Sequence, residues 1–166
     1  MNKQELEALD DRGVSAWDQH DANAFLELLD DTFEWLDTTQ PVPIRDRQGA
    51  SEFFEGWVRA FPDLRFSRLN RIVGDDAVAG ELQWEGTNTG PLTMGEMEIP
   101  PTNNRVVSRT AYFVRLRDGK ITEFRTYNDV LAMMAQLGLA EVMAHEEEQV
   151  TVDLRSRQSE EASSTR

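Results

Sequence analysis

The sequence has no cysteine among its 166 residues, and it has only two lysines and two histidines. Without cysteine the chain forms no disulfide and has no thiolate to act as a nucleophile or a metal ligand. The histidines, His20 and His145, lie far apart and form no His-x-x-x-His pair, so no metal centre is expected. The glycines form neither a GxGxxG nor a Walker motif, which leaves a nucleotide cofactor without a signature.

Long apolar runs are missing as well. No stretch of about 18 or more apolar residues occurs, and residues 1–13 alternate charge with leucine instead of forming a signal peptide. We therefore expect a soluble protein that is not exported, with a cytoplasmic location by default. A chain of 166 residues fits a single domain with one core.

The charge is strongly one-sided, with 31 acidic against 17 basic residues and a formal net charge of −14. Such a surface repels phosphate backbones and anionic lipids, so neither nucleic acid nor a membrane is an expected partner. Only Lys3 and Lys120 are lysines. An acidic surface with so little lysine suits a salt-adapted cytoplasm, but a GC-rich genome alone would also deplete lysine, and both explanations stay open.

Apolar residues recur at helical spacing in the first part of the chain. Asp21 is a suitable N-cap for the second of these helices, and Pro62 follows the end of the third. Between the second and third helices, residues 32–37 alternate like a strand, with Phe33, Trp35 and Asp37 on one side. The three predicted helices cover residues 5–17, 22–29, and either 46–60 or 51–60.

The period changes to two after Pro62, which predicts consecutive strands. The segment from Asp118 to Lys120 predicts a tight hairpin, because Asp-Gly tolerates the positive φ that such turns require. The strands are expected at 64–73, 77–87, 106–116 and 121–127, followed by a helix at 130–137 that ends at Gly138. Helices followed by an antiparallel sheet indicate an α+β fold with the helices on one face of the sheet. A sheet that curls around them leaves an apolar pocket, the usual form of a small-molecule site.

Composition changes again after Gly138. Residues 141–166 hold seven acids and three arginines, with almost no large apolar side chain after Leu154. Such a segment lacks the apolar surface needed to offset its ordering entropy. We therefore divide the chain into a domain over residues 1–140 and an acidic C-terminal tail over 141–166, which we expect to be mobile.

A series of short motifs occurs in a fixed order: Phe61-Pro62-Asp63, Thr87-Asn88-Thr89-Gly90, Pro100-Pro101-Thr102-Asn103-Asn104-Arg105, Asp118-Gly119-Lys120-Ile121, Asp129, and Gln136-Leu137-Gly138. In this order they resemble the SnoaL-like polyketide cyclases, a branch of the NTF2-like or ketosteroid-isomerase-like superfamily. The resemblance implies an NTF2-like cone, in which N-terminal helices pack on a strongly curved, mainly antiparallel sheet that encloses a pocket. It also implies a homodimer formed through the sheet.

The resemblance carries a mechanism too. In the cyclases of this family an aspartate acts as general acid and base in an intramolecular aldol closure, aided by polar side chains on the neighbouring strand and by no cofactor. Apolar surroundings raise the pKa of a carboxyl group toward neutrality, which suits this role. Ketosteroid isomerase is similar in this respect. Aligned by the hairpin and the Gln-Leu-Gly end, the aspartate falls on Thr126, and the helper residues fall on Thr110 and Tyr112.

Thr126 does not titrate near neutral pH, so a catalytic acid has to come from elsewhere in this chain. Asp37 is one candidate, because it shares a side of the strand with Trp35, although a solvated strand end is the alternative. Asp129 is the other candidate, and its alternative role is to cap the last helix.

The pocket is expected to bind a hydrophobic small molecule. Core packing is the alternative role of its aromatic residues, because large aromatics are ordinary core residues. Two functions stay open: a cofactor-free lyase or isomerase of the cyclase or ketosteroid-isomerase type that acts on a carbonyl compound, or a non-catalytic protein that binds a small apolar ligand. The predicted lining is Trp17, Trp35, Phe54, Trp57, Trp84, Thr110, Tyr112 and Thr126.

Overall fold

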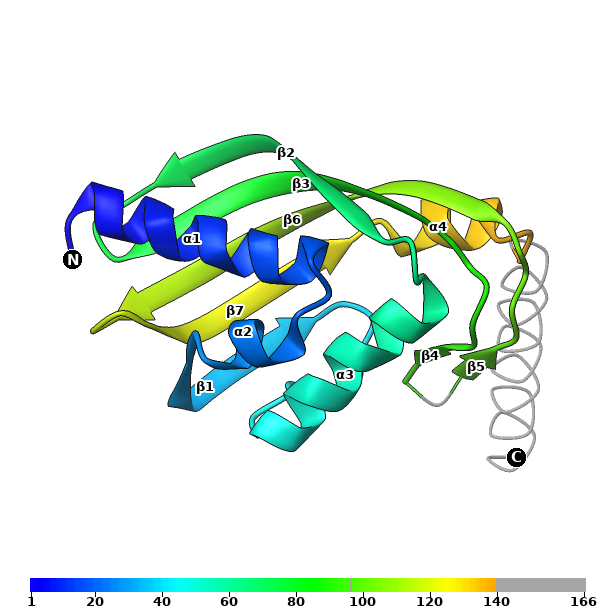
Figure 1. Cartoon of the computed structure of the whole chain (residues 1–166), viewed down its shortest axis with the longest axis horizontal. Helices are drawn as coiled ribbons and strands as arrows, with labels where there is room; N and C mark the ends of the chain where they lie inside the picture. Colours follow the sequence, from blue (N-terminus) through cyan, green and yellow to red (C-terminus); the bar gives the residue numbers. More distant parts are fainter. Residues whose placement is uncertain (96, 140–166) are drawn as a thin grey trace, which may run out of the picture.

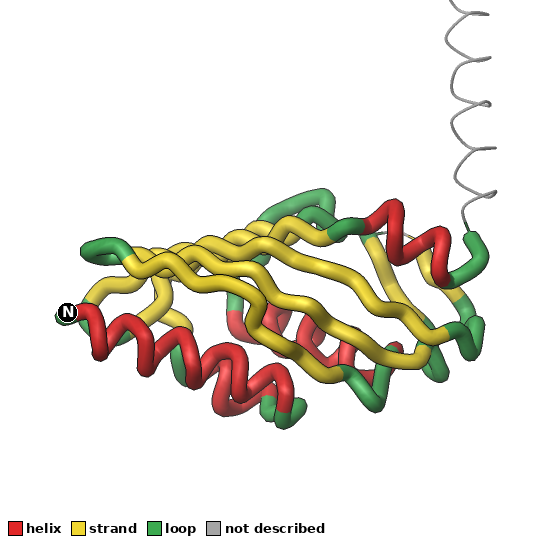
Figure 2. Tube along the Cα trace, turned by 90° about the horizontal axis from the view of Figure 1, so that it is seen from above, coloured by secondary structure: helices red, strands yellow, loops and turns green. Residues whose placement is uncertain are grey.

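A computed structural model describes residues 1–95 and 97–139, so the predicted tail at 141–166 lies outside the described residues. Three helices lie on one side of a curved sheet, and a fourth lies at its end (Figures 1 and 2). The helices are α1 (Lys3–Asp18), α2 (Ala22–Leu26), α3 (Arg47–Ala60) and α4 (Val130–Gln136). The strands are β1 (Leu29–Asp37), β2 (Arg65–Val73), β3 (Ala77–Thr87), β4 (Leu92–Met94), β5 (Met97–Ile99), β6 (Arg105–Arg117) and β7 (Lys120–Asn128).

The larger of the two described sheets has the strand order β1-β7-β6-β3-β2. Strands β2, β3, β6 and β7 pair antiparallel, whereas β1 pairs parallel to β7. The predicted α+β class and mainly antiparallel sheet are therefore confirmed. The parallel pairing brings the end of β1, where Asp37 lies, next to Thr126 on β7.

Side-chain caps set the start of each N-terminal helix. Asn2 and Glu5 form a capping box on α1, each side chain accepting a hydrogen bond from the backbone N–H of the other. Asp21 caps α2, as predicted, through the N–H of Ala24. Asp46 caps α3 through the N–H of Gly49, so this helix starts at the earlier of the two predicted positions.

The predicted second helix is too long. It ends at Leu26, and β1 starts at Leu29, where the sequence has an apolar pattern that also suits a helix. Leu29 pairs with Ile121 of β7, and the Ile121 N–H donates to the carbonyl of Leu28 at 2.7 Å. Pairing with a distant strand therefore overrides the local helical spacing.

The β4–β5 hairpin was not predicted from the sequence. The segment that precedes it docks on the end of α3: the N–H groups of Thr89 and Gly90 donate to the carbonyl of Ala60. A Cβ at Gly90 would lie 2.1 Å from the carbonyl oxygen of Arg59, so this approach requires glycine. The predicted Asp118-Gly119 hairpin is confirmed, with positive φ at both residues.

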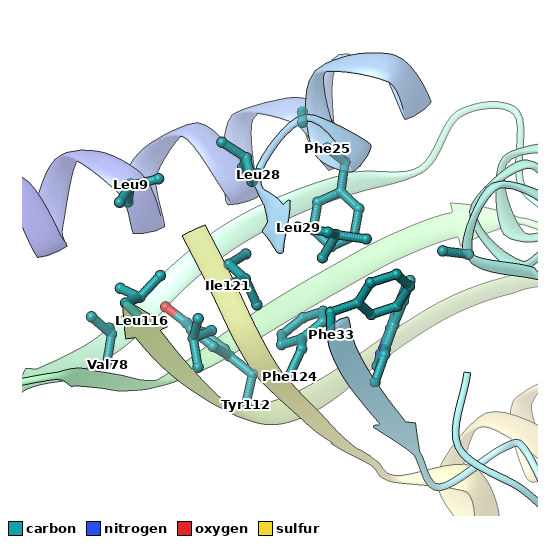
Figure 3. Close-up of a cluster of buried hydrophobic side chains, with 14 of the residues drawn as sticks. Leu9, Phe25, Leu28, Leu29, Phe33, Val78, Tyr112, Leu116, Ile121 and Phe124 are labelled. Carbon is teal, nitrogen blue, oxygen red and sulfur yellow. The ribbon is translucent and has the colours of Figure 1, made fainter. Parts of the chain in front are cut away.

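The core lies between the helices and the concave face of the sheet. Leu9 of α1, Phe25 of α2, Phe33 of β1 and Phe124 of β7 belong to one buried cluster (Figure 3). A second cluster surrounds Trp57 and includes the inner side of α4. Within the described part of the chain, no helix is both long and apolar enough to cross a membrane.

Candidate functional site

A cavity of about 90 Å³ lies between the helices and the concave face of the sheet. A cavity of about 10–15 Å³ by this measure holds one water molecule, so the space suits several waters or a ring-sized group. The wall is mostly apolar, and all four tryptophans of the chain contribute to it: Trp17, Trp35, Trp57 and Trp84. Trp35, Trp57 and Trp84 are also buried in the core, so they both line the cavity and pack in the core.

The structure also brings Thr110, Tyr112 and Thr126 to the cavity wall. Phe54, by contrast, does not line the cavity, which corrects its predicted role. It packs behind Trp17, with the two ring centroids 3.9 Å apart, because α3 turns its side chain into the core.

The two candidate acids lie in different surroundings. Asp129 is exposed, does not line the cavity, and caps α4 by accepting the Ala132 N–H at 3.0 Å. Asp37 lines the cavity and is 5% exposed, so it does not lie at a solvated strand end. The alternation that places Asp37 on the same side as Trp35 therefore also brings it to the cavity.

Four hydrogen bonds from described residues reach the Asp37 carboxylate. Oδ1 accepts from the backbone N–H and the hydroxyl of Thr39, which follows in the turn after β1. Oδ2 accepts from the Thr126 hydroxyl and, at 3.0 Å, from the Asn128 amide. The Trp35 indole N–H donates to the Thr126 oxygen at 3.3 Å. These contacts hold the carboxylate in one orientation on the wall.

A family model described as SnoaL-like polyketide cyclase matches residues 7–137. The chain belongs to the SnoaL-like polyketide cyclase family. The resemblance of the short motifs is thereby confirmed. A comparison with curated proteins finds no match to this sequence.

Solved structures agree on the NTF2-like cone. A SnoaL-like protein from a Jannaschia species shares 20% identity and a TM-score of 0.73, over 81% of this chain and 92% of that one. AclR, a proposed hydroxylase from Streptomyces galilaeus, shares 23% identity and a TM-score of 0.71, over 82% and 98%. IdmH, a proposed polyketide cyclase from Streptomyces antibioticus, shares 26% identity and a TM-score of 0.67, over 80% and 98%.

The cavity of this SnoaL-like protein has a second polar end, which was not predicted from the sequence. Asp10 of α1 lines the cavity, and its Oδ2 accepts from Arg68 at 2.8 Å and from Arg71 at 3.4 Å. Tyr112 is 3% exposed, and its hydroxyl has no hydrogen-bond partner among the described residues. Figure 3 shows this hydroxyl turned away from Phe124.

The surroundings of Tyr112 keep its hydroxyl protonated. Burial raises the pKa of Tyr112 well above its usual range, and the Asp10 carboxylate adds to the rise, while the Arg68 guanidinium opposes it. The hydroxyl is therefore a donor at neutral pH. The pKa of Arg68 is raised as well: burial opposes the rise, and contacts with Tyr112 and Asp10 outweigh it.

Asn128 and Asp10 could have been predicted as site residues from their spacing to inward-facing neighbours. Asn128 lies two positions after Thr126 on a strand, so it shares the inner face. Asp10 lies four positions after Leu6 on a helix, so it shares the apolar side of α1. No cluster of three or more histidine or acidic residues suited to a metal ion occurs within residues 1–95 and 97–139.

Proposed function

We propose that this SnoaL-like protein is a cofactor-free enzyme that transfers protons at carbon in a hydrophobic carbonyl compound, with Asp37 as general base and acid. The observation that supports the proposal is a buried carboxylate on the wall of an otherwise apolar cavity. A general base must reach the proton it removes, and Asp37 is the acid at the Thr126 end of the cavity that meets this condition.

The reaction follows from that position. The Asp37 carboxylate removes a proton from the carbon next to the carbonyl, and the electron pair of the C–H bond forms an enolate. In an isomerase the Asp37 carboxyl returns the proton to another carbon. In a cyclase the enolate carbon attacks a second carbonyl of the same molecule, a C–C bond forms, and the resulting alkoxide takes the proton back.

Thr126 and Asn128 hold the carboxylate for this step. A carboxylate has about four lone-pair sites, and the four donors occupy them. Substrate must therefore displace one donor, and the Thr126 hydroxyl, which lies on the cavity wall and turns about one bond, is the one we expect to move. In this mechanism Thr126 stands where the relatives have their catalytic aspartate. Its hydroxyl covers the neighbouring Asp37 carboxylate and must turn away before substrate can reach it.

The same saturation favours the second function, a protein that binds an apolar ligand without turning it over. All four lone-pair sites of the Asp37 carboxylate accept hydrogen bonds from the protein, so it has a structural role and cannot take a proton from a ligand until one donor moves away. The two functions are separated by whether proton transfer occurs.

The test uses 2-tetralone, an apolar bicyclic ketone, in D₂O. Proton NMR follows the loss of the hydrogens next to the carbonyl in the presence of the wild type, Asp37→Asn and Asp129→Asn. We expect exchange above the buffer rate with the wild type and with Asp129→Asn, and a decrease of about 100-fold with Asp37→Asn. Equal exchange by wild type and Asp37→Asn would remove Asp37 from catalysis. Binding without exchange by the wild type would support the second function.

We also propose that the chain forms a homodimer through the outer face of the sheet. Val107, Phe113 and Tyr127 are 40%, 52% and 43% exposed on β6 and β7, and the rings of Phe113 and Tyr127 contact edge to face at 6.0 Å. Exposed aromatics on a sheet face are typical of subunit interfaces. Phe113→Glu should give a monomer in sedimentation experiments, and an unchanged mass would contradict this interface.

A further inference from the structure

The Tyr112 hydroxyl points toward Asp10 and Arg68 at the cavity wall, but neither of them, nor any other described residue, meets it at hydrogen-bonding distance and angle. It is buried, it lines the space, and it has no hydrogen-bond partner in the described part of the chain. Buried hydroxyl groups in folded proteins are almost always hydrogen-bonded. Arg68 Nε, in the same cluster, is the other buried side-chain atom without a partner among the described residues. Of these two atoms only the Tyr112 hydroxyl belongs to a residue that lines the cavity, so it is the one available to a ligand.

Local structure holds Tyr112 in this position. Tyr112 on β6 pairs with Gly80 on the neighbouring strand β3. A Cβ at Gly80 would lie 2.5 Å from the Tyr112 hydroxyl oxygen and 2.6 Å from two ring carbons. Tyr112 therefore lies over β3, with its hydroxyl toward Asp10 and Arg68, because position 80 has no side chain.

Asp10 supplies the complementary acceptor. The described hydrogen bonds to its carboxylate, from Arg68 and Arg71, both end on Oδ2. A donor and a carboxylate acceptor side by side suit a hydroxyl group, which accepts from Tyr112 and donates to Asp10. A ligand carbonyl would use only the donor, and a ligand carboxylate would meet the negative charge of Asp10.

Sheet register gives the spacing between the two polar ends. Asp37 pairs with Thr126, Thr126 with Tyr112, and Tyr112 with Gly80, so these residues form one row across four strands. Neighbouring strands lie about 4.8 Å apart, so the row spans roughly 14 Å along the sheet. The rest of the lining is mostly apolar and includes Trp35, Trp84 and Phe124. A ligand that reaches both ends is therefore elongated and apolar in the middle.

We propose that Tyr112 and Asp10 form a subsite that binds a phenolic or alcoholic hydroxyl group of the ligand, at the end of the cavity opposite Asp37. This subsite deepens the proposed function and rests on it only in taking the cavity as the ligand site. It adds a requirement for a second oxygen group, at a distance from the reacting carbonyl.

The test compares 2-naphthol with 2-methylnaphthalene, which have nearly the same shape but differ in the hydroxyl. Titration calorimetry gives the dissociation constant of each compound with the wild type and with each variant. One hydrogen bond to a buried partner corresponds to about a tenfold preference, so we expect the wild type to bind 2-naphthol about tenfold more tightly. Tyr112→Phe should reduce this preference to about twofold or less.

Three further variants make the result specific. Tyr127→Phe removes the same hydroxyl from the exposed outer face and should keep the preference. Gly80→Ala keeps the Tyr112 hydroxyl but displaces it, so the preference should fall as it does in Tyr112→Phe. Asp37→Asn should keep the preference, because the hydroxyl binds at the other end.

The proposal is overturned if the preference survives Tyr112→Phe, or if Asp37→Asn removes it instead. Equal affinity of the wild type for the two compounds, or no binding of either, would also overturn it, because a bound water would then be enough to pair Tyr112. Failure of proton exchange with 2-tetralone would leave the preference for 2-naphthol unchanged, so the two proposals fail separately.

Discussion

Each polar end of the cavity contains a buried carboxylate, but the two carboxylates are stabilised by different kinds of hydrogen-bond donor. At one end Asp37 is held by neutral donors from β7 and from the turn after β1. At the other end Asp10 is held by the charged side chains of Arg68 and Arg71, and the Tyr112 hydroxyl beside it is unpaired among the described residues. The protein itself supplies the hydrogen bonds at the Asp37 end, whereas a ligand hydroxyl is proposed to pair with Tyr112 at the other end.

Removing the charged partner should have the largest effect. Arg68→Met leaves the Asp10 side chain, which is 3% exposed, with Arg71 alone at 3.4 Å. We expect the free energy of unfolding to fall by about 3 kcal/mol, because a buried carboxylate that loses its partner at 2.8 Å and keeps one contact at 3.4 Å is poorly compensated. Urea unfolding measures the loss. Arg45→Met is the matched control, since its partner Glu34 is 43% exposed, and the loss there should stay below about 1 kcal/mol. Equal losses would contradict the importance of burial.

A side chain at position 80 tests the placement of Tyr112. Gly80→Ala should lower the free energy of unfolding by about 2 kcal/mol, because the added methyl group overlaps the Tyr112 ring. In the background of Tyr112→Leu the same substitution should cost clearly less, since the ring is gone. Urea unfolding of the two single variants and the double variant gives the coupling energy. Additive losses would mean that Gly80 does not position Tyr112.

Thr126 and Thr110 allow a matched test at the Asp37 end. Thr126→Val removes the donor to Asp37 and the acceptor of the Trp35 N–H, so we expect a loss of about 1.5 kcal/mol. Thr110→Val removes only hydrogen bonds of 3.3 and 3.4 Å to backbone carbonyls, and its loss should stay below about 0.5 kcal/mol. Urea unfolding of both variants measures the difference. A larger loss for Thr110→Val would contradict the network around Asp37.

The smallest expected effect appears at alkaline pH. Burial, with a contribution from Asp10, raises the pKa of Tyr112 in the folded chain above its value of about 10 in the unfolded chain. The contribution of Tyr112 to stability is therefore complete below about pH 10 and decreases as the pH rises toward the folded pKa. Urea unfolding at pH 8 and pH 11 should show a larger decrease for the wild type than for Tyr112→Phe. Equal decreases would contradict the shift.

The fold could be predicted from the sequence where one pattern acts alone. Alternation placed β3 over the same residues that the structure gives, and the Asp-Gly turn fixed the β6–β7 hairpin. Leu29 could not be assigned locally, because its strand forms only against Ile121, far along the chain. The β4–β5 strands are three residues each, too short for alternation to be recognised.

The site could be predicted in part for a similar reason. Strand alternation was enough to bring Asp37 to the cavity, because successive side chains of a strand point to opposite faces, whereas Tyr112 and Thr126 were predicted from the family resemblance. Helical spacing did not separate Phe54 from Trp57, which lie on the same broad apolar side of α3 but pack at different depths. The pairing of Asp10 with Arg68 joins α1 to β2 and has no local signal.

The contact between Asp37 and Thr126 joins residues 89 positions apart, so it exists only in a chain that has folded completely. A compound that fills the cavity therefore binds the native state and not the unfolded ensemble, and mass action converts its affinity into thermal stability. At one hundred times its dissociation constant such a compound adds about 2.7 kcal/mol, which raises the melting temperature of a domain of this size by roughly 5–10 °C. Melting curves of the unmodified chain thus become a way to search for its ligand before any reaction is known.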